Sequence, residues 1–164
     1  MAGFGDNPSF RVYATAAGYV VPDGTTDAQI AAARQRGALV IDRYEKRFGG
    51  VRTAGFSQER SWPRNGAQTT WGQAIPFDEI PAAIVAASYE AAFLELTNPG
   101  SLSPVVTGST AVKREKVGQL EVEYASSTSS SPADLVALAT PVVTAIETLL
   151  APFLMPHLPG ALVV

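Results

Sequence analysis

The stretch "TDAQIAAARQRGALVIDRYEKRFGG", Thr26 to Gly50, carries the strongest fold signal in this sequence. Thr26 followed three residues later by Gln29 is a capping box, in which each side chain accepts a hydrogen bond from the other residue's backbone N–H. Apolar residues then recur at helical spacing: Ile30, Gly37, Ile41, Tyr44 and Phe48. Gly49 and Gly50 are expected to end the helix, because glycine readily adopts the left-handed conformation. The stretch therefore predicts an amphipathic helix.

A second apolar pattern predicts a helix that begins near Asp78, with Pro81 in its first turn, where proline is tolerated. Its buried stripe is Ile80, Ile84, Ala87, Ala91 and Leu94. The helix is expected to stop at Asn98-Pro99-Gly100. We interpret Asp78 and Glu79 as acids that favour the positive end of the helix dipole, rather than as a catalytic acid/base pair.

Two further helices are expected, one near each end of the chain. A short helix is plausible around Val12 to Tyr19. The last helix has two possible starts, Ser131-Pro132 or Thr140-Pro141, each a cap residue before a proline. We favour Pro141, since proline inside a continuous helix costs about 3 kcal/mol. The expected core face is Val142, Ile146, Leu149 and Phe153.

A stretch of strand-like alternation, "VKREKVGQLEVEY" (Val112 to Tyr124), predicts a β-hairpin with a two-residue turn at Gly118-Gln119. The register then pairs Lys116 with Glu121 and Arg114 with Glu123, and places Lys113 opposite Tyr124. The other face carries Val117, Leu120, Val122 and Tyr124. An isolated hairpin is marginal in water, so this apolar face must lie on the helices or on a neighbouring copy.

The segment 51–76 has no sustained periodicity and predicts a long loop, as does the connector after the second helix. Trp62 and Arg64 in this loop allow two interpretations. They could contact single-stranded nucleic acid, or Trp62 could anchor the loop to the core, which we favour. The fold class expected is mainly α, a small bundle of three to five helices with a protruding β-hairpin and long loops. Residues 1–154 would form one domain and 155–164 a C-terminal tail.

Charges are few and unevenly distributed. Charged residues make up 16% of the chain, against roughly 25% in typical soluble domains. Residues 34–64 hold eight Lys or Arg and three acids, whereas residues 65–164 hold three cations and nine acids. Two solvated faces explain this pattern, as does head-to-tail association of basic and acidic faces into a ring. A nucleic-acid footprint is disfavoured by the interleaved acids and the net charge of −3.

Several function classes lack sequence support. The chain has no cysteine and one histidine, His157, so we expect no metal site, no cofactor and no catalytic residue, and therefore no enzyme. Residues 135–164 hold one charge, Glu147, but their four prolines argue against a membrane span. The start shows no secretory signal, which favours synthesis in a host cytoplasm.

Five stretches in order resemble a family of tailed-phage proteins, the head–tail connector adaptors, also described as DnaT-like single-stranded-DNA-binding proteins. They are "IDRYEKRFGGVR", "WPRNG", "IPFDEIPAAIVAASYEAA", "VKREKVGQLEVEY" and "PVVTAIETLLAPFL", which together cover residues 41–154. Residues 1–26 depart from the family pattern, with a shortened first helix that contains Gly18. The resemblance implies a helical bundle with a protruding hairpin, repeated about twelve-fold in a ring beneath the portal in the virion neck.

The resemblance also implies partners: other copies of the chain, the portal protein, a tail-side stopper or tail-terminator protein, and genomic double-stranded DNA passing through the channel. The expected ring contacts are Arg43, Arg47, Arg52, Lys113, Arg114, Lys116, Glu121, Glu123 and Tyr124. The expected portal-docking tail contains Met155, His157, Leu158 and Leu162. The alternative function, a single-stranded-DNA-binding module, would use Trp62 and Arg64.

Overall fold

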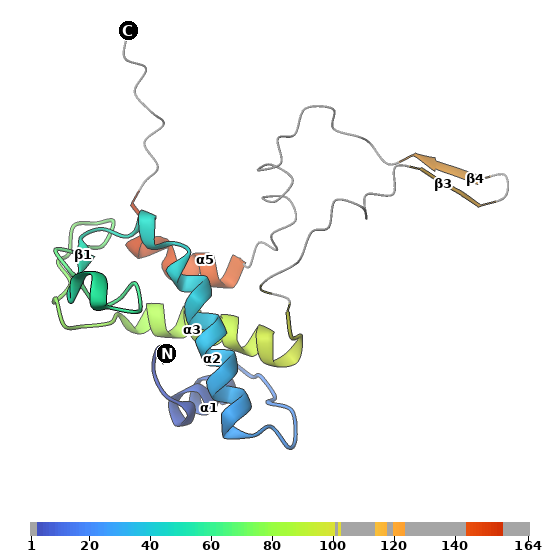
Figure 1. Cartoon of the computed structure of the whole chain (residues 1–164), viewed down its shortest axis with the longest axis horizontal. Helices are drawn as coiled ribbons and strands as arrows, with labels where there is room; N and C mark the ends of the chain where they lie inside the picture. Colours follow the sequence, from blue (N-terminus) through green and yellow to red (C-terminus); the bar gives the residue numbers. More distant parts are fainter. Residues whose placement is uncertain (1–2, 101, 103–113, 118–119, 124–143, 156–164) are drawn as a thin grey trace, which may run out of the picture. The chain divides into compact units, whose positions relative to one another are not determined.

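The computed structural model describes residues 3–100, 102, 114–117, 120–123 and 144–155 (Figure 1). The chain divides into two compact units, one formed by Met1–Leu102 with Val143–Val164 and the other by Ser103–Val142. The described residues are mainly helical, with a small antiparallel hairpin, which confirms the expected fold class. The first unit is therefore a helical unit and the second contains the hairpin.

The helical unit contains four described α-helices: α1 (Asn7–Ala16), α2 (Asp27–Asp42), α3 (Ala82–Thr97) and α5 (Thr144–Leu150). Three 3₁₀ turns lie between or after them: η1 (Glu45–Arg47), η2 (Gly55–Ser57) and η3 (Ala151–Phe153). A two-stranded sheet pairs β1 (Val51–Arg52) with β2 (Arg64–Asn65). Figure 1 shows α2 crossing α3, with α1 on one side of this crossing and α5 on the other.

The start of α2 is as predicted, but its end is not. Both hydrogen bonds of the Thr26–Gln29 capping box are present. The helix ends at Asp42, and the backbone then tightens into 3₁₀-type bonds, with Tyr44 N–H donating to the Ile41 carbonyl at 3.0 Å. Phe48 still reaches the core by this route and is 5% exposed. The prediction that Gly49 and Gly50 end this helix was therefore wrong.

The start of α3 also differs from the prediction. The helix begins at Ala82, with Pro81 as its N-cap in an extended conformation. A residue before proline is disfavoured in the α conformation, so Ile80 cannot extend the helix backwards. Asp78 and Glu79 lie in the preceding turn rather than in the first helical turn, so their expected capping role was wrong. The C-terminal stop at Asn98 is confirmed.

Helices α2 and α3 pack closely against each other at Gly37. A Cβ atom at this position would lie 2.4 Å from the Ser88 carbonyl oxygen and 2.8 Å from the Ala92 backbone nitrogen. Any side chain at this position would therefore clash with the backbone of α3. That backbone could make room only if the whole of α3 shifted. Ile41 of α2 and Ile84 of α3 are both fully buried in the same core.

The N-terminal segment is held on this helix pair by polar contacts. α1 spans Asn7–Ala16, earlier than the predicted Val12–Tyr19, because Asp6 provides the N-cap by accepting from Ser9 N–H at 2.7 Å. Glu90 of α3 is 9% exposed and accepts hydrogen bonds from the hydroxyls of Tyr13 at 2.6 Å and Tyr19 at 2.8 Å. Burial, together with this carboxylate, raises the pKa of Tyr13.

The C-terminal helix completes the core. Ile146 and Leu150 of α5 are fully buried, and Leu149 and Phe153 pack beside them. Leu154 forms a bridge with Phe48, so the end of the helical unit pairs with the chain that follows α2. The two possible helix starts near Pro132 and Pro141, and Val142, lie outside the described residues.

The predicted hairpin register is confirmed. β3 (Arg114–Val117) pairs antiparallel with β4 (Leu120–Glu123), with Val117 opposite Leu120, Lys116 opposite Glu121 and Arg114 opposite Glu123. Lys113, Tyr124 and the turn residues Gly118 and Gln119 lie outside the described residues.

Replacing Gly37 by Ala tests the close helix crossing. In an exposed helix this change stabilises by about 1 kcal/mol. Here we expect a net loss of roughly 1–3 kcal/mol in the free energy of unfolding, because the methyl group overpacks the core. Urea unfolding measures the change, with the exposed Gln35→Ala as a control within about 0.5 kcal/mol of wild type. An increase in stability would show that α2 and α3 do not cross this closely.

Candidate functional site

The segment between α2 and α3 is anchored by Trp62, as the favoured interpretation predicts. The indole is 2% exposed and packs edge-on against Phe48, at 5.5 Å between ring centroids, and against Phe153, at 6.0 Å. Arg64 is also buried, and its guanidinium donates to the carbonyls of Gly49 at 2.7 Å and Gly50 at 2.6 Å. The residues named as alternative DNA contacts thus face the protein interior, and neither presents a surface on which a base would stack.

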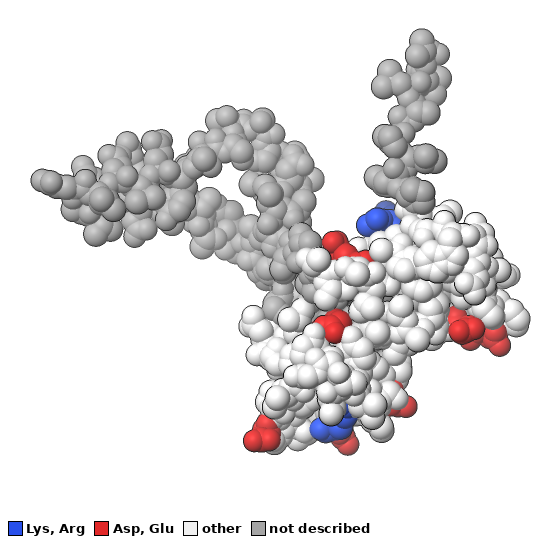
Figure 2. Space-filling model, turned by 180° about the vertical axis from the view of Figure 1, so that it is seen from behind, with Lys and Arg blue, Asp and Glu red and all other residues white. Residues whose placement is uncertain are grey.

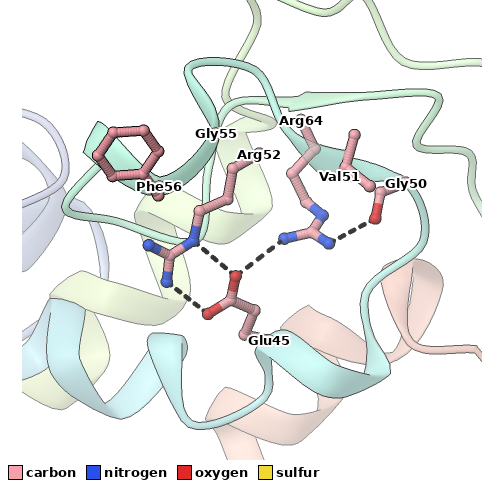
Figure 3. A pocket seen from close by; sticks show the side chains of 7 residues that line it. All are labelled: Glu45, Gly50, Val51, Arg52, Gly55, Phe56 and Arg64. Carbon is pink, nitrogen blue, oxygen red and sulfur yellow. Dashed lines mark hydrogen bonds and ion pairs between the residues drawn. The ribbon is translucent and has the colours of Figure 1, made fainter.

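A charge cluster lies beneath the exposed edge of this segment (Figure 3). Glu45 of η1 accepts hydrogen bonds from Arg52 Nε at 2.6 Å and Nη2 at 2.5 Å, and Arg64 Nη1 lies 3.6 Å from the same carboxylate. The bonded Arg52 guanidinium holds the pKa of Glu45 below its ordinary value, and the carboxylate raises the pKa of Arg52. Burial lowers the pKa of Arg64. Arg52 and Arg64 are therefore both paired with the Glu45 carboxylate, and both also donate hydrogen bonds to backbone carbonyls.

An open pocket of about 470 Å³ lies over this cluster, lined by Glu45, Gly50, Val51, Arg52, Gly55, Phe56 and Arg64. Its rim is apolar: Val51 is 65% exposed and the Phe56 side chain is fully exposed. Figure 3 shows Phe56 on the Arg52 side of the pocket and Val51 beside Gly50. The floor has one net positive charge, but both of its arginines already make hydrogen bonds within the fold, so the apolar rim suits a protein partner better than a small anion.

Two more exposed aromatic side chains belong to the same segment, Trp71 at 66% and Phe77 at 59% exposure. Phe77 lies close to β1, because its carbonyl accepts a hydrogen bond from the Thr53 hydroxyl at 2.6 Å. Sequence reasoning missed these residues and Phe56. It recognised that the loop contained aromatic residues, but an aperiodic segment gives no signal that separates a buried tryptophan from an exposed one.

Most arginines of the basic half serve the fold. Arg34 donates to backbone carbonyls of residues 3–5, Arg36 pairs with the buried Glu95, and Arg60 lies 3.0 Å from Asp42. Figure 2 shows one face of the molecule, on which uncharged residues cover most of the described surface and Lys and Arg appear only as small separate areas. On this face the cations do not form one continuous basic area.

The expected interface residues occupy three different settings. Arg43 and Arg47 are exposed near the end of α2, and Arg43 donates to the Leu102 carbonyl at 3.0 Å. Arg52 is half-buried in the charge cluster, and Met155 is 49% exposed. Arg114, Lys116, Glu121 and Glu123 lie in the hairpin strands. Lys113, Tyr124, His157, Leu158 and Leu162 lie outside the described residues.

The described part of the chain offers neither a metal-binding cluster nor a membrane-spanning helix. Those residues contain no group of three or more His, Asp or Glu that could hold a metal ion. None of the described helices is both long and apolar enough to span a bilayer.

Comparison with protein families gives a match over most of the chain. Residues 6–162 fit the model of the family described as "Putative DnaT-like ssDNA binding protein". The chain belongs to this family. The match to this DnaT-like family includes the segment with the charge cluster and both strands of the hairpin. Neither the curated proteins nor the solved structures contain a match to the chain.

Replacing Glu45 by Gln tests the charge cluster. The folded-state pKa of Glu45 lies below its ordinary 4.5, so its ion pairs stabilise the fold above that pH and lose this effect as pH falls through the lowered pKa. We expect E45Q to lower the free energy of unfolding by about 1 kcal/mol near pH 7, because the cluster is partly exposed.

Urea unfolding near pH 7 and near pH 3 measures this difference, which should shrink in acid. The exposed Glu59 of the same segment offers the matched control, Glu59→Gln, which should follow wild type at both pH values. An equal loss for E45Q at both pH values would contradict an electrostatic role for Glu45.

Proposed function

We propose that this chain is a structural head–tail connector, an adaptor of a tailed bacteriophage that forms a ring below the portal. The observation that carries the proposal is that several arginines are used inside the fold. They contact acids or backbone carbonyls and do not form a phosphate-binding surface. The surface of segment 51–77 instead presents Val51, Phe56, Trp71 and Phe77. Exposed apolar groups of this kind mark contacts with other proteins.

The adaptor role accounts for the remaining features of the chain. A ring conduit needs heterologous contacts between copies, and the separate hairpin unit offers one half of such a contact. Its lumen should not be strongly basic, because phosphate contacts would hold passing DNA. The net charge of −3 agrees with this requirement. The proposed partners are other copies in a ring of about twelve, the portal protein, a tail-side stopper or terminator, and genomic DNA in the channel, all in the virion neck.

A second candidate function is single-stranded-DNA binding, which the family description favours. In this structure such binding would use the exposed Phe56 and Trp71 for base stacking and the exposed Lys46 and Arg47 for phosphate contacts, rather than the buried Trp62 and Arg64. Both candidates are non-catalytic, and we propose no enzymatic activity.

The mass of the purified protein, measured by native mass spectrometry alone and with a portal ring from the same genome, tests the adaptor proposal. We expect a large complex of fixed stoichiometry with portal. The double variant Lys46→Ala/Arg47→Ala discriminates between the candidates, because it would weaken a DNA complex by removing phosphate contacts. A protein that stays monomeric with portal yet binds single-stranded DNA in a Lys46- and Arg47-dependent way would contradict the adaptor function.

A further inference from the structure

We propose that the β3–β4 hairpin of one copy docks on the loop surface of a second copy, where the loop surface is defined by Val51, Phe56 and Phe77. This inference rests on the proposed ring assembly and identifies the two surfaces that meet in it. The occupant is therefore a second copy of this chain, not an unrelated protein.

The loop surface is exposed but held in place from beneath. Phe56 lies on η2, whose flanks are fixed by Gln58: its side-chain amide donates to the Arg60 and Pro63 carbonyls at 2.8 and 2.9 Å, and its amide oxygen accepts from Ala54 N–H at 3.1 Å. Arg52 Nη1 also donates to the Gln58 carbonyl at 2.6 Å. These hydrogen bonds hold the loop in one conformation, so the exposed Phe56 is preorganised for contact. Preorganisation lowers the entropy cost of ordering the loop when a partner binds.

The charges under the loop surface favour an apolar protein partner. Glu45 accepts from Arg52 and faces Arg64, so this floor has a single net positive charge, and both arginines already make hydrogen bonds within the fold. Nucleic-acid affinity depends on cations that release counterions from phosphates. An apolar strand face, by contrast, needs only the rim formed by Val51 and Phe56 around the pocket.

The hairpin supplies such a face. Its confirmed register places Val117, Leu120 and Val122 on one side of the two-stranded sheet. The other side carries the opposite-charge pairs Lys116–Glu121 and Arg114–Glu123. Glu115 lies opposite Val122 on the mainly apolar side, so the hairpin residues 114–117 and 120–123 have a net charge of −1. A two-stranded hairpin in a unit of its own is marginal in water and gains stability when its apolar side is covered.

The chain is long enough to deliver the hairpin to a neighbour. Eleven residues separate Leu102 from Arg114, and twenty separate Glu123 from Thr144. The shorter connection can span at most about 36 Å when extended, whereas a 100-residue domain has a radius of gyration of about 13 Å. One copy can therefore place its hairpin on the next. Because the two surfaces differ, the contact is heterologous, the type that forms a ring when the rotation between copies closes.

Cysteine cross-linking tests this docking cleanly, because the chain has no cysteine of its own. One preparation carries Phe56→Cys and a second carries Val122→Cys; they are mixed, assembled with portal rings and oxidised. We expect the intermolecular disulfide to form at least about tenfold faster than with the control Val20→Cys in place of Phe56→Cys. Val20 is also highly exposed, at 81%, and lies in the connection between α1 and α2.

The outcomes separate the docking from the proposed function. If the protein assembles with portal but the Phe56→Cys and Val20→Cys preparations cross-link to Val122→Cys equally, or not at all, the docking is wrong. The adaptor function would then remain supported. Absence of any portal complex would contradict the adaptor function, and cross-linking in the concentrated free protein would still report on the docking.

The exposed-site variant Phe56→Ser gives an independent readout. It should lose assembly while keeping the melting temperature of wild type, because Phe56 makes no core contact. If F56S assembled normally and instead lost affinity for single-stranded DNA, the loop surface would be a nucleic-acid site and the docking would be wrong.

Discussion

The crossing of α2 and α3 at Gly37 is the constraint on which the rest of the helical unit depends. Because a Cβ at Gly37 would meet the α3 backbone, the two helices touch without an intervening side chain. This contact fixes the position of α2 on α3, and η1, which follows α2, presents Glu45. It also fixes where α3 presents Glu90 to the tyrosines of the N-terminal segment. The segment 51–77 therefore connects two helices, α2 and α3, whose positions relative to each other are fixed by this contact.

Internal use of charge links this fold to its proposed role. Few charged residues are present, and most arginines of the basic half contact carbonyls or acids within the helical unit. The surface that results is poor in charge, and its segment 51–77 presents exposed aromatic residues. The family description refers to single-stranded DNA, whereas the disposition of these side chains favours contacts with protein.

The sequence predicted correctly those features of the fold that depend on residues close together in the chain or on the burial of one large side chain. The capping box at Thr26, the hairpin register and the anchoring role of Trp62 were accessible because each depends on neighbouring residues or on burial of one large side chain. The end of α2 at Asp42 was not, because it depends on a contact distant in sequence: the Asp42 carboxylate accepts from Ser61 N–H at 2.8 Å. The Glu45 cluster and the exposed Phe56 were missed for the same reason, since no periodicity marks them.

We propose that most arginines of the basic half hold the fold together and do not form a nucleic-acid-binding surface. The affinity for a single-stranded oligonucleotide, measured against salt concentration, tests it most directly. We predict no measurable binding at physiological salt and only a shallow dependence below it, because few phosphate contacts are available. Tight binding that weakens steeply with added salt would contradict the claim and would favour single-stranded-DNA binding as the function.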